Sequence, residues 1–276
     1  MSALVTTDWL AERLHHPEIK VMDASWHMPQ DKRDAQAEYK DAHIPGAVFA
    51  DIDKISDADS SYPHMAPSPD LFAQAMGALG VGDTHHVVVY DTQGLFSAAR
   101  LWWMLRVYGH ERVSVLDGGF PKWRKEGRQV ESGEISPQAA VFTPAFNPYL
   151  GAEAAHVLEH TRQKTATVLD ARSAERFAGS VPEPRPGVRS GHIPGSLNVP
   201  FGTLLNADKT MKKPAELKEL FQRAGVDFAK PVITSCGSGV TACILALGLY
   251  ECGRKDVAVY DGSWAQWGAR EELPVA

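Results

Sequence analysis

Short runs of β-branched and aliphatic residues alternate along this chain with longer stretches of helical periodicity. Runs of this kind, bounded by polar and turn residues, are typical of strands that are buried on both faces. In the first half we predict strands over 20–23, 48–51, 87–91 and 113–117, and helices over 8–14, 70–79 and 97–108. In the second half we predict strands over 167–170, 196–199, 232–235 and 257–261, and a buried helix over 242–250.

This alternation of strands and helices predicts an α/β fold with mainly parallel sheets that carry helices on both faces. Active sites in such sheets lie beyond the carboxyl ends of the strands. The residues that follow a predicted strand are therefore the first place to look for chemistry. For the helix over 8–14, the sequence offers Thr7 or Asp8 as the N-terminal cap.

The two halves of the chain repeat the same phrases in the same order. Val-Met-Asp-Ala at 21–24 matches Val-Leu-Asp-Ala at 168–171, and His-Ile-Pro-Gly at 43–46 recurs at 192–195. Asp-Gly-Gly-Phe-Pro-Lys-Trp at 117–123 matches Asp-Gly-Ser-Trp-Ala-Gln-Trp at 261–267. Such a repeat indicates two homologous domains. We place them at 1–136 and 150–276, joined by a proline-containing linker at 137–149.

Composition narrows the function classes. The net charge of −6 and the pI near 6.0, with scattered basic residues, argue against a nucleic-acid partner. The three cysteines form no even framework and no C-x-x-C pair, which favours a reducing, cytoplasmic setting. We expect no signal or membrane segment, because no long apolar run is present. No clustered His/Cys pattern predicts a metal, and no cofactor motif is present.

Cys236 is the candidate nucleophile. It follows the strand at 232–235 and opens the sequence Cys-Gly-Ser-Gly-Val-Thr-Ala, directly before an apolar helix. Backbone N–H groups at the positive end of a helix favour the reactive thiolate. We expect the backbone of residues 237–242 to cradle it, through Gly237, Gly239, Val240, Thr241 and Ala242. The two glycines suit a backbone that curls closely around an anion.

The repeat offers an internal control, because features that only one half carries are candidates for function. With an offset of 144 residues, Cys236 faces Thr92 in the first half, so the cysteine loop is unique. The histidines of the repeated phrase, His43 and His192, are interpreted as structural residues that hold a turn. Cys243 and Cys252 are interpreted as core or near-surface thiols.

A second observation excludes one family of cysteine enzymes. Phosphatases with a cysteine in such a loop need an arginine six residues later to hold the phosphate. Position 242 is Ala in this chain. Hydrolysis of phosphate esters is therefore not expected.

The tandem repeat, the two His-Ile-Pro-Gly phrases and a Cys-Gly-Ser-Gly-Val-Thr-Ala loop in the second half together resemble the two-domain rhodanese-like sulfurtransferases. Within that family the loop is similar to that of the branch acting on 3-mercaptopyruvate, because the thiosulfate-specific branch typically carries a basic residue in or near it. In place of a longer tyrosine-containing segment found in some members, this chain has Gly-Leu-Phe at 94–96.

The resemblance implies roles for further residues. Arg176 and Arg185 match the family's arginine pair, which would hold a carboxylate. Arg172 and Arg189 are rivals that fit a solvated surface position better. Ser238, His64 and Asp53 match a proton relay whose histidine and aspartate come from the first half, although Asp51 could be confused with Asp53 on spacing alone.

The resemblance implies sulfur transfer through a Cys236 persulfide, with release of pyruvate and delivery of the sulfur to a thiol such as thioredoxin or to cyanide. Two alternatives stay open at this point. One is a thiosulfate sulfurtransferase with an unusual neutral loop. The other is a non-catalytic sulfur carrier, against which the arginine pair argues.

Overall fold

The computed structural model describes residues 2–276, and the chain forms two compact units. The first unit holds the residues up to Ala58, with Ala66–Asn147 and Ala207–Met211. The second holds Asp59–Met65, Pro148–Asn206 and Lys212–Ala276. Each unit therefore includes a short segment from the other half of the sequence. This division bears directly on the candidate site, because His64 belongs to the second unit.

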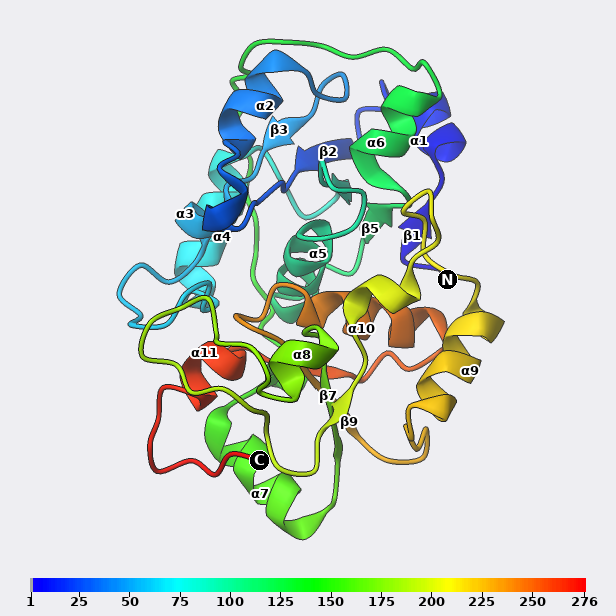
Figure 1. Ribbon diagram of the computed structural model, residues 1–276. Coiled ribbons are helices and arrows are strands. Elements are labelled where there is room, and N and C mark those ends of the chain that lie inside the picture. The colour runs from blue at the N-terminus through cyan, green and yellow to red at the C-terminus, as the bar shows by residue number, and fades with distance from the viewer. Residues whose placement is uncertain (1) are drawn as a thin grey trace. The chain divides into compact units, whose positions relative to one another are not determined.

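The first unit is built on five parallel strands in the order β1-β5-β4-β2-β3. Figure 1 labels β1, β2, β3 and β5 of this sheet. The strands are β1 Leu4–Val5, β2 Ile19–Asp23, β3 Val48–Phe49, β4 His86–Tyr90 and β5 Val113–Leu116. The α-helices are α1 Thr7–Arg13, α2 Ala35–Asp41, α3 Ile52–Ile55, α4 Pro69–Ala78, α5 Ala98–Val107 and α6 Gly119–Lys125, with a 3-10 turn at Pro29–Asp31.

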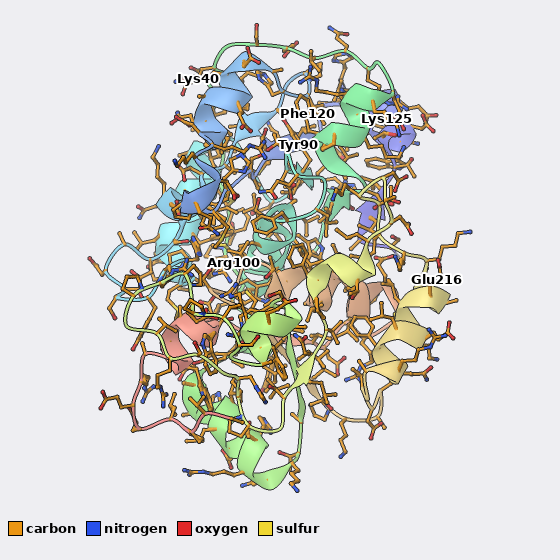
Figure 2. The ribbon with its side chains drawn as sticks, viewed as in Figure 1. Lys40, Tyr90, Arg100, Phe120, Lys125 and Glu216 are labelled. Atoms are coloured by element: carbon orange, nitrogen blue, oxygen red, sulfur yellow. The ribbon has the colours of Figure 1, made fainter. Side chains whose placement is uncertain are left out.

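Alternate residues of the first sheet pack against different helices. Val88 and Tyr90 of β4 belong to a core cluster with Leu10 of α1 and with Phe120 and Trp123 of α6. Because side chains alternate along a strand, Val87 and Val89 point to the other face, and α5 packs against β4 and β5. Figure 2 contrasts buried Tyr90 and Phe120 with Lys40 and Lys125, which lie on the outside.

The second unit repeats this architecture with the strand order β6-β10-β9-β7-β8, again all parallel. The strands are β6 Gly151–Ala152, β7 Thr167–Asp170, β8 Leu197–Asn198, β9 Val232–Ser235 and β10 Ala258–Tyr260. The α-helices are α7 Ala154–Gln163, α8 Ala174–Phe177, α9 Pro214–Arg223, α10 Ala242–Glu251 and α11 Ser263–Trp267, with 3-10 turns at Pro148–Leu150 and Phe201–Leu204.

The predicted α/β class and its parallel sheets are confirmed. The two-residue edge strands β1 and β6 were not predicted, since two residues give no periodicity to detect. The predicted cap of the first helix is wrong. Thr6 is the cap, and its hydroxyl accepts a hydrogen bond from the Trp9 N–H at 3.1 Å. Among the residues described, every helix is too short or too polar to cross a lipid bilayer.

Candidate active site

Cys236 lies at the carboxyl end of β9, the central strand of the second sheet, and is 2% exposed. The loop that it opens is fixed against the start of α11. The Cys236 carbonyl accepts from Trp264 N–H at 2.9 Å, and the Gly237 carbonyl accepts from Ala265 N–H at 2.8 Å. Cys236 N–H donates to Ser263 Oγ at 3.0 Å. These contacts occupy the loop's first carbonyls.

The corresponding loop of the first unit contains an anion of its own. The Asp91 carboxylate follows β4 and accepts hydrogen bonds from Gln93, Phe96, Ser97 and Ala98 N–H at 2.7–2.9 Å. Three of the four bonds reach the same oxygen, Oδ2. Four converging amides around one carboxylate show that this strand–loop–helix geometry stabilises negative charge.

Strand register shows that Asp91 corresponds to Cys236. Asp23 pairs with Tyr90 in the first sheet and Asp170 with Ser235 in the second, so the next residues, 91 and 236, are equivalent. The Asp91 carbonyl also accepts from Phe120 N–H, as the Cys236 carbonyl does from Trp264 N–H. The predicted alignment of Cys236 with Thr92 is therefore wrong by one residue. Gly237 is the counterpart of Thr92.

Two amides of the cysteine loop are available in the second unit, whereas Cys243 N–H donates to the Val240 carbonyl at 3.2 Å. Ser238 and Thr241 correspond to Gln93 and Phe96, and their N–H groups donate to no atom within residues 2–276. Gly239 has a φ of +79°, which lets the backbone turn at that point without strain from a side chain. A thiolate or a persulfide sulfur at Cys236 would occupy the position that the carboxylate takes in the first unit.

His64 and Ser238 are brought together. His64 Nδ1 lies 2.9 Å from Ser238 Oγ, and both residues are 6% exposed. His64 has a φ of +61°, a conformation that non-glycine residues rarely adopt and that often marks a functional position. Although His64 comes from the first half of the sequence, it lies in the segment Asp59–Met65 of the second unit. The expected pairing of these two residues thus occurs within one unit.

The first unit contains a counterpart of this arrangement. Lys209 has a φ of +68° and belongs to the segment Ala207–Met211, which packs with the first unit. Its side chain lies against Gly94, the residue that corresponds to Gly239. Met211 N–H in the same segment donates to Asp117 Oδ1 at 2.7 Å. The loop after Asp91 and the loop after Cys236 are therefore each contacted by one residue with positive φ. That residue is Lys209 in the first unit and His64 in the second.

Asp53 lies on α3 in the first unit, where its carboxylate accepts from Trp26 Nε1–H at 3.1 Å. Asp51 caps the same helix, accepting from the N–H groups of Asp53 and Lys54. This capping contact gives Asp51 a structural use and separates the two aspartates that spacing alone confuses. The part of Asp53 in a relay remains a prediction.

Arg176 on α8 lies beside the cysteine loop. Its Nη2 is 3.1 Å from the position that a Cβ on residue 237 would take. The guanidinium is held from behind by Glu183, which accepts from Nε at 3.1 Å and from Nη2 at 2.5 Å. Arg185 is half-buried two residues beyond Glu183, and its contact with a substrate remains a prediction.

Neither rival arginine is the solvated side chain that was expected. Arg172 is 2% exposed, and its guanidinium pairs with Asp170 and with Glu183 Oε1. Arg189 donates to the backbone carbonyls of residues 267, 268, 270 and 273, which holds the C-terminal turns in place. We interpret both as structural residues, because all three nitrogens of the Arg172 guanidinium and Nε and Nη2 of Arg189 already donate to protein acceptors.

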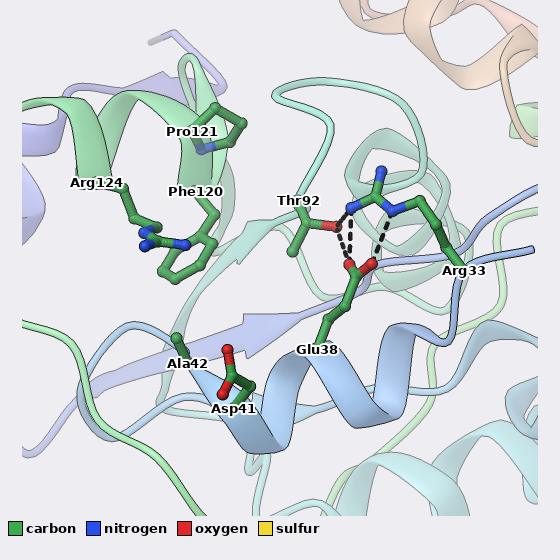
Figure 3. A pocket seen from close by; sticks show the side chains of 8 residues that line it. All are labelled: Arg33, Glu38, Asp41, Ala42, Thr92, Phe120, Pro121 and Arg124. Carbon is green, nitrogen blue, oxygen red and sulfur yellow. Dashed lines mark hydrogen bonds and ion pairs between the residues drawn. The ribbon is translucent and has the colours of Figure 1, made fainter. Parts of the chain in front are cut away.

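Where the second unit carries Arg176, the first carries Glu38. Each precedes an aromatic residue, Tyr39 or Phe177, whose carbonyl accepts from the histidine of the repeated phrase at 2.8 Å. Glu38 points towards Arg33 and Thr92 in a pocket of about 290 Å³ (Figure 3). Glu38 is itself paired with Arg33, whose Nη2 lies 3.5 Å from Thr92 Oγ1, so the guanidinium nearest this loop comes from a position that differs from that of Arg176 in the second unit.

The remaining sequence interpretations concern structural residues. His43 and His192 stack on the same aromatics that they bond, with ring centroids 4.3 and 3.8 Å apart, so their structural role is confirmed. Cys243 is buried, and Cys252 is partly exposed with a thiol pKa raised by burial to about 11. Within residues 2–276 no group of three or more metal-ligating side chains has the geometry to bind a metal ion.

Comparison with known proteins shows the family of this chain. The family model for the rhodanese-like domain matches twice, at residues 6–126 and 153–270. The chain belongs to the rhodanese-like family. A rhodanese-like relative from Escherichia coli, 3-mercaptopyruvate sulfurtransferase, is 47% identical over 98% of this chain and 96% of its own length.

Two further rhodanese-like proteins extend the comparison. The mitochondrial thiosulfate/3-mercaptopyruvate sulfurtransferase 1 of Arabidopsis thaliana is 44% identical over 99% of this chain and 77% of its own. The crystal structure of SseA from Escherichia coli, a 3-mercaptopyruvate sulfotransferase with the rhodanese fold, superposes with a TM-score of 0.88 at 44% identity. It covers 96% of this chain and 99% of that one.

Proposed function

We propose that this protein is a 3-mercaptopyruvate sulfurtransferase in which Cys236 carries the sulfur as a persulfide. The observation that carries the proposal is the Arg176 guanidinium beside Gly237, next to the cysteine, in a loop that has no basic side chain. A planar guanidinium suits a carboxylate, and mercaptopyruvate carries one carboxylate next to its keto group. The names of the relatives at 44–47% identity support the same substrate.

The reaction begins with the Cys236 thiolate in its cradle of amides. The thiolate attacks the sulfur of mercaptopyruvate, an S–S bond forms, and the C–S bond breaks. The electron pair of that bond leaves on carbon, which gives the enolate of pyruvate, and the donor sulfur keeps its proton as a persulfide. Arg176 and Arg185 hold the donor carboxylate, which fixes the sulfur in line with Cys236.

The enolate then needs a proton. His64 and Ser238, 2.9 Å apart, supply a path for one, and Asp53 would orient the imidazole. A thiol acceptor attacks the outer sulfur of the persulfide and restores the Cys236 thiolate. We propose thioredoxin as a protein acceptor, and cyanide takes its place in an assay. Three free cysteines suit a reducing compartment, and we propose the cytoplasm.

Thiosulfate is the competing donor, because the name of the Arabidopsis relative contains both. Thiosulfate is a dianion without a planar carboxylate, so a cationic loop side chain would favour it. Residues 237–242 include no such side chain. We therefore expect kcat/KM to be higher for mercaptopyruvate than for thiosulfate.

The test is the mass of the protein after incubation with mercaptopyruvate. We expect a gain of one sulfur atom on the peptide that holds Cys236, none in Cys236→Ser, and an undiminished gain in the control Cys243→Ser. Arg176→Ala should raise the KM for mercaptopyruvate roughly ten- to a hundredfold, since it removes a charge-assisted bond. A sulfur gain that persists in Cys236→Ser, or a parental KM in Arg176→Ala, would overturn the proposal.

A further inference from the structure

A chain of four alternating charges runs from the end of β7 to the cysteine loop. Asp170, the last residue of β7, accepts two bonds from Arg172 Nε at 3.0–3.1 Å and one from Nη2 at 2.6 Å. Arg172 Nη1 donates to Glu183 Oε1 at 2.9 Å. Glu183 in turn accepts the two bonds from Arg176. The far end of this chain is the guanidinium beside Gly237.

The exposure of the four side chains shows which part of the chain is anchored. Asp170, Arg172 and Glu183 have side chains that are 3%, 1% and 4% exposed, whereas Arg176 is 23% exposed. Arg172 is also stacked 4.5 Å over the Trp264 ring. Three partners are therefore fixed in the interior, and the fourth is the group that can meet a ligand.

The first unit shows that the fold does not require these ion pairs. Asp23 corresponds to Asp170 and makes the same turn, accepting from the N–H two residues later at 2.9 Å. That later residue is Ser25, where the second unit has Arg172, and Glu38 stands where it has Arg176. Only the aspartate is common to both sheets. The ion pairs beyond it belong to the unit that carries Cys236.

We propose that Glu183 is a positioning residue for the donor, acting through Arg176. An arginine side chain has many rotamers, and ordering it when a ligand binds weakens the binding. Glu183 holds two of its donors in advance, so the guanidinium already lies at the loop. Nη1 has no bond to another side chain in the described residues and is left to meet a carboxylate. This inference rests on the proposed function of Arg176.

The proposal and long-range electrostatics predict opposite effects of Glu183→Gln on the binding of the donor. Glu183→Gln removes a negative charge near the cysteine, which by long-range attraction alone would tighten the binding of an anionic donor. Loss of positioning would instead weaken it. Glu175→Gln is the matched control. Glu175 is an exposed acid on α8, the helix that carries Arg176, and it has no bond to the Arg176 side chain.

The experiment measures kcat, KM and thermal midpoint for Glu183→Gln, Glu175→Gln, Arg176→Ala and the double variant Glu183→Gln with Arg176→Ala. We expect Glu183→Gln to raise the KM for mercaptopyruvate about tenfold. Glu175→Gln should keep or slightly lower that KM. In the Arg176→Ala background, Glu183→Gln should add nothing further, since its effect passes through Arg176.

Alkylation of Cys236 is also measured with iodoacetate, which carries a carboxylate, and with neutral iodoacetamide; in Glu183→Gln we expect only the reaction with iodoacetate to slow. Three outcomes would overturn the inference: an unchanged or lowered KM in Glu183→Gln, an equal rise in both backgrounds, or alkylation by iodoacetamide slowed as much as that by iodoacetate. The last would mean general damage to the Cys236 loop. If Glu183→Gln does not fold, Glu183→Asp is measured instead, because it keeps the charge beside Arg172 while withdrawing from Arg176. A parental KM in Arg176→Ala would overturn the proposed function itself, which separates the two failures.

Discussion

Gly237→Ala tests the contact between the cysteine loop and Arg176 with a single methyl group. Gly237 is not among the residues with positive φ, so the backbone accepts alanine there without strain. The added Cβ would lie 3.1 Å from Arg176 Nη2 and 3.7 Å from Nη1. Ordinary contact begins near 3.4 Å, so the guanidinium must retreat by a few tenths of an ångström. The nearest atoms met by this methyl group belong to Arg176 alone.

The size of the effect follows from what holds the guanidinium. Glu183 binds Nε and Nη2 from behind, so the head group cannot retreat freely and must turn or stretch those bonds. If half of one charge-assisted bond to the substrate is lost, the cost is about 1 kcal/mol, or roughly a fivefold rise in KM. Folding stability should change by less than about 0.5 kcal/mol, as for other substitutions without a buried defect.

The assay is steady-state kinetics with mercaptopyruvate and with thiosulfate, alongside thermal melts. Gly202→Ala is the control, since a Cβ at Gly202 meets nothing within 4 Å and its φ is not positive. We expect a raised KM for mercaptopyruvate in Gly237→Ala and none in Gly202→Ala. Equal kinetics in the two variants would refute the placement of Arg176 at the substrate.

Two further predictions concern proton transfer and pH. His64→Ala should lower kcat with mercaptopyruvate by about a hundredfold or more, with a smaller loss for thiosulfate. Asp53→Asn should lower kcat in the same direction, and Asp51→Asn should have a smaller effect. Full activity of the His64 variant in the same steady-state assay would remove His64 from the relay. Burial raises the pKa of Asp23 from 3.8 to about 6, so its ionisation should cost the fold about 3 kcal/mol as pH rises from 4 to above 6. Thermal melts should therefore show Asp23→Asn gaining stability over the parent across that interval, and a gap independent of pH would contradict the assignment.

The sequence predicted the strands that are buried on both faces, because their β-branched runs leave no other reading. It also predicted the equivalence of the two halves. Counting between repeated phrases failed by one residue at the cradle, since the distances between phrases differ from 144 to 149 residues. The strand register and the hydrogen bonds of Asp91 show instead that Asp91 is the counterpart of Cys236. Asp91 could have been noticed, because an aspartate directly after a strand is a natural acceptor for the next amides.

Glu183 was out of reach for sequence reasoning. It stands seven residues from Arg176 across a stretch that contains Gly179 and Pro182, where no periodicity relates one side chain to another. Its one visible signal is that it lies between the two candidate arginines. Arg172 was misjudged for a similar reason, because its burial depends on Asp170, Glu183 and Trp264, which come from three separate elements. Contacts of this kind depend on the tertiary fold.

The two short segments that pack with the opposite unit limit how this gene product can be divided. A fragment beginning at residue 150 would contain Cys236, Ser238 and both candidate arginines, yet it would lack Asp59–Met65 and with it the imidazole beside Ser238. The reciprocal fragment would lose Lys209 from the loop of Asp91. Because each unit is completed by a segment from the other half of the sequence, deleting either half would remove residues from the unit that remains. The half of the sequence that lacks the cysteine is thus needed to complete the unit that contains it.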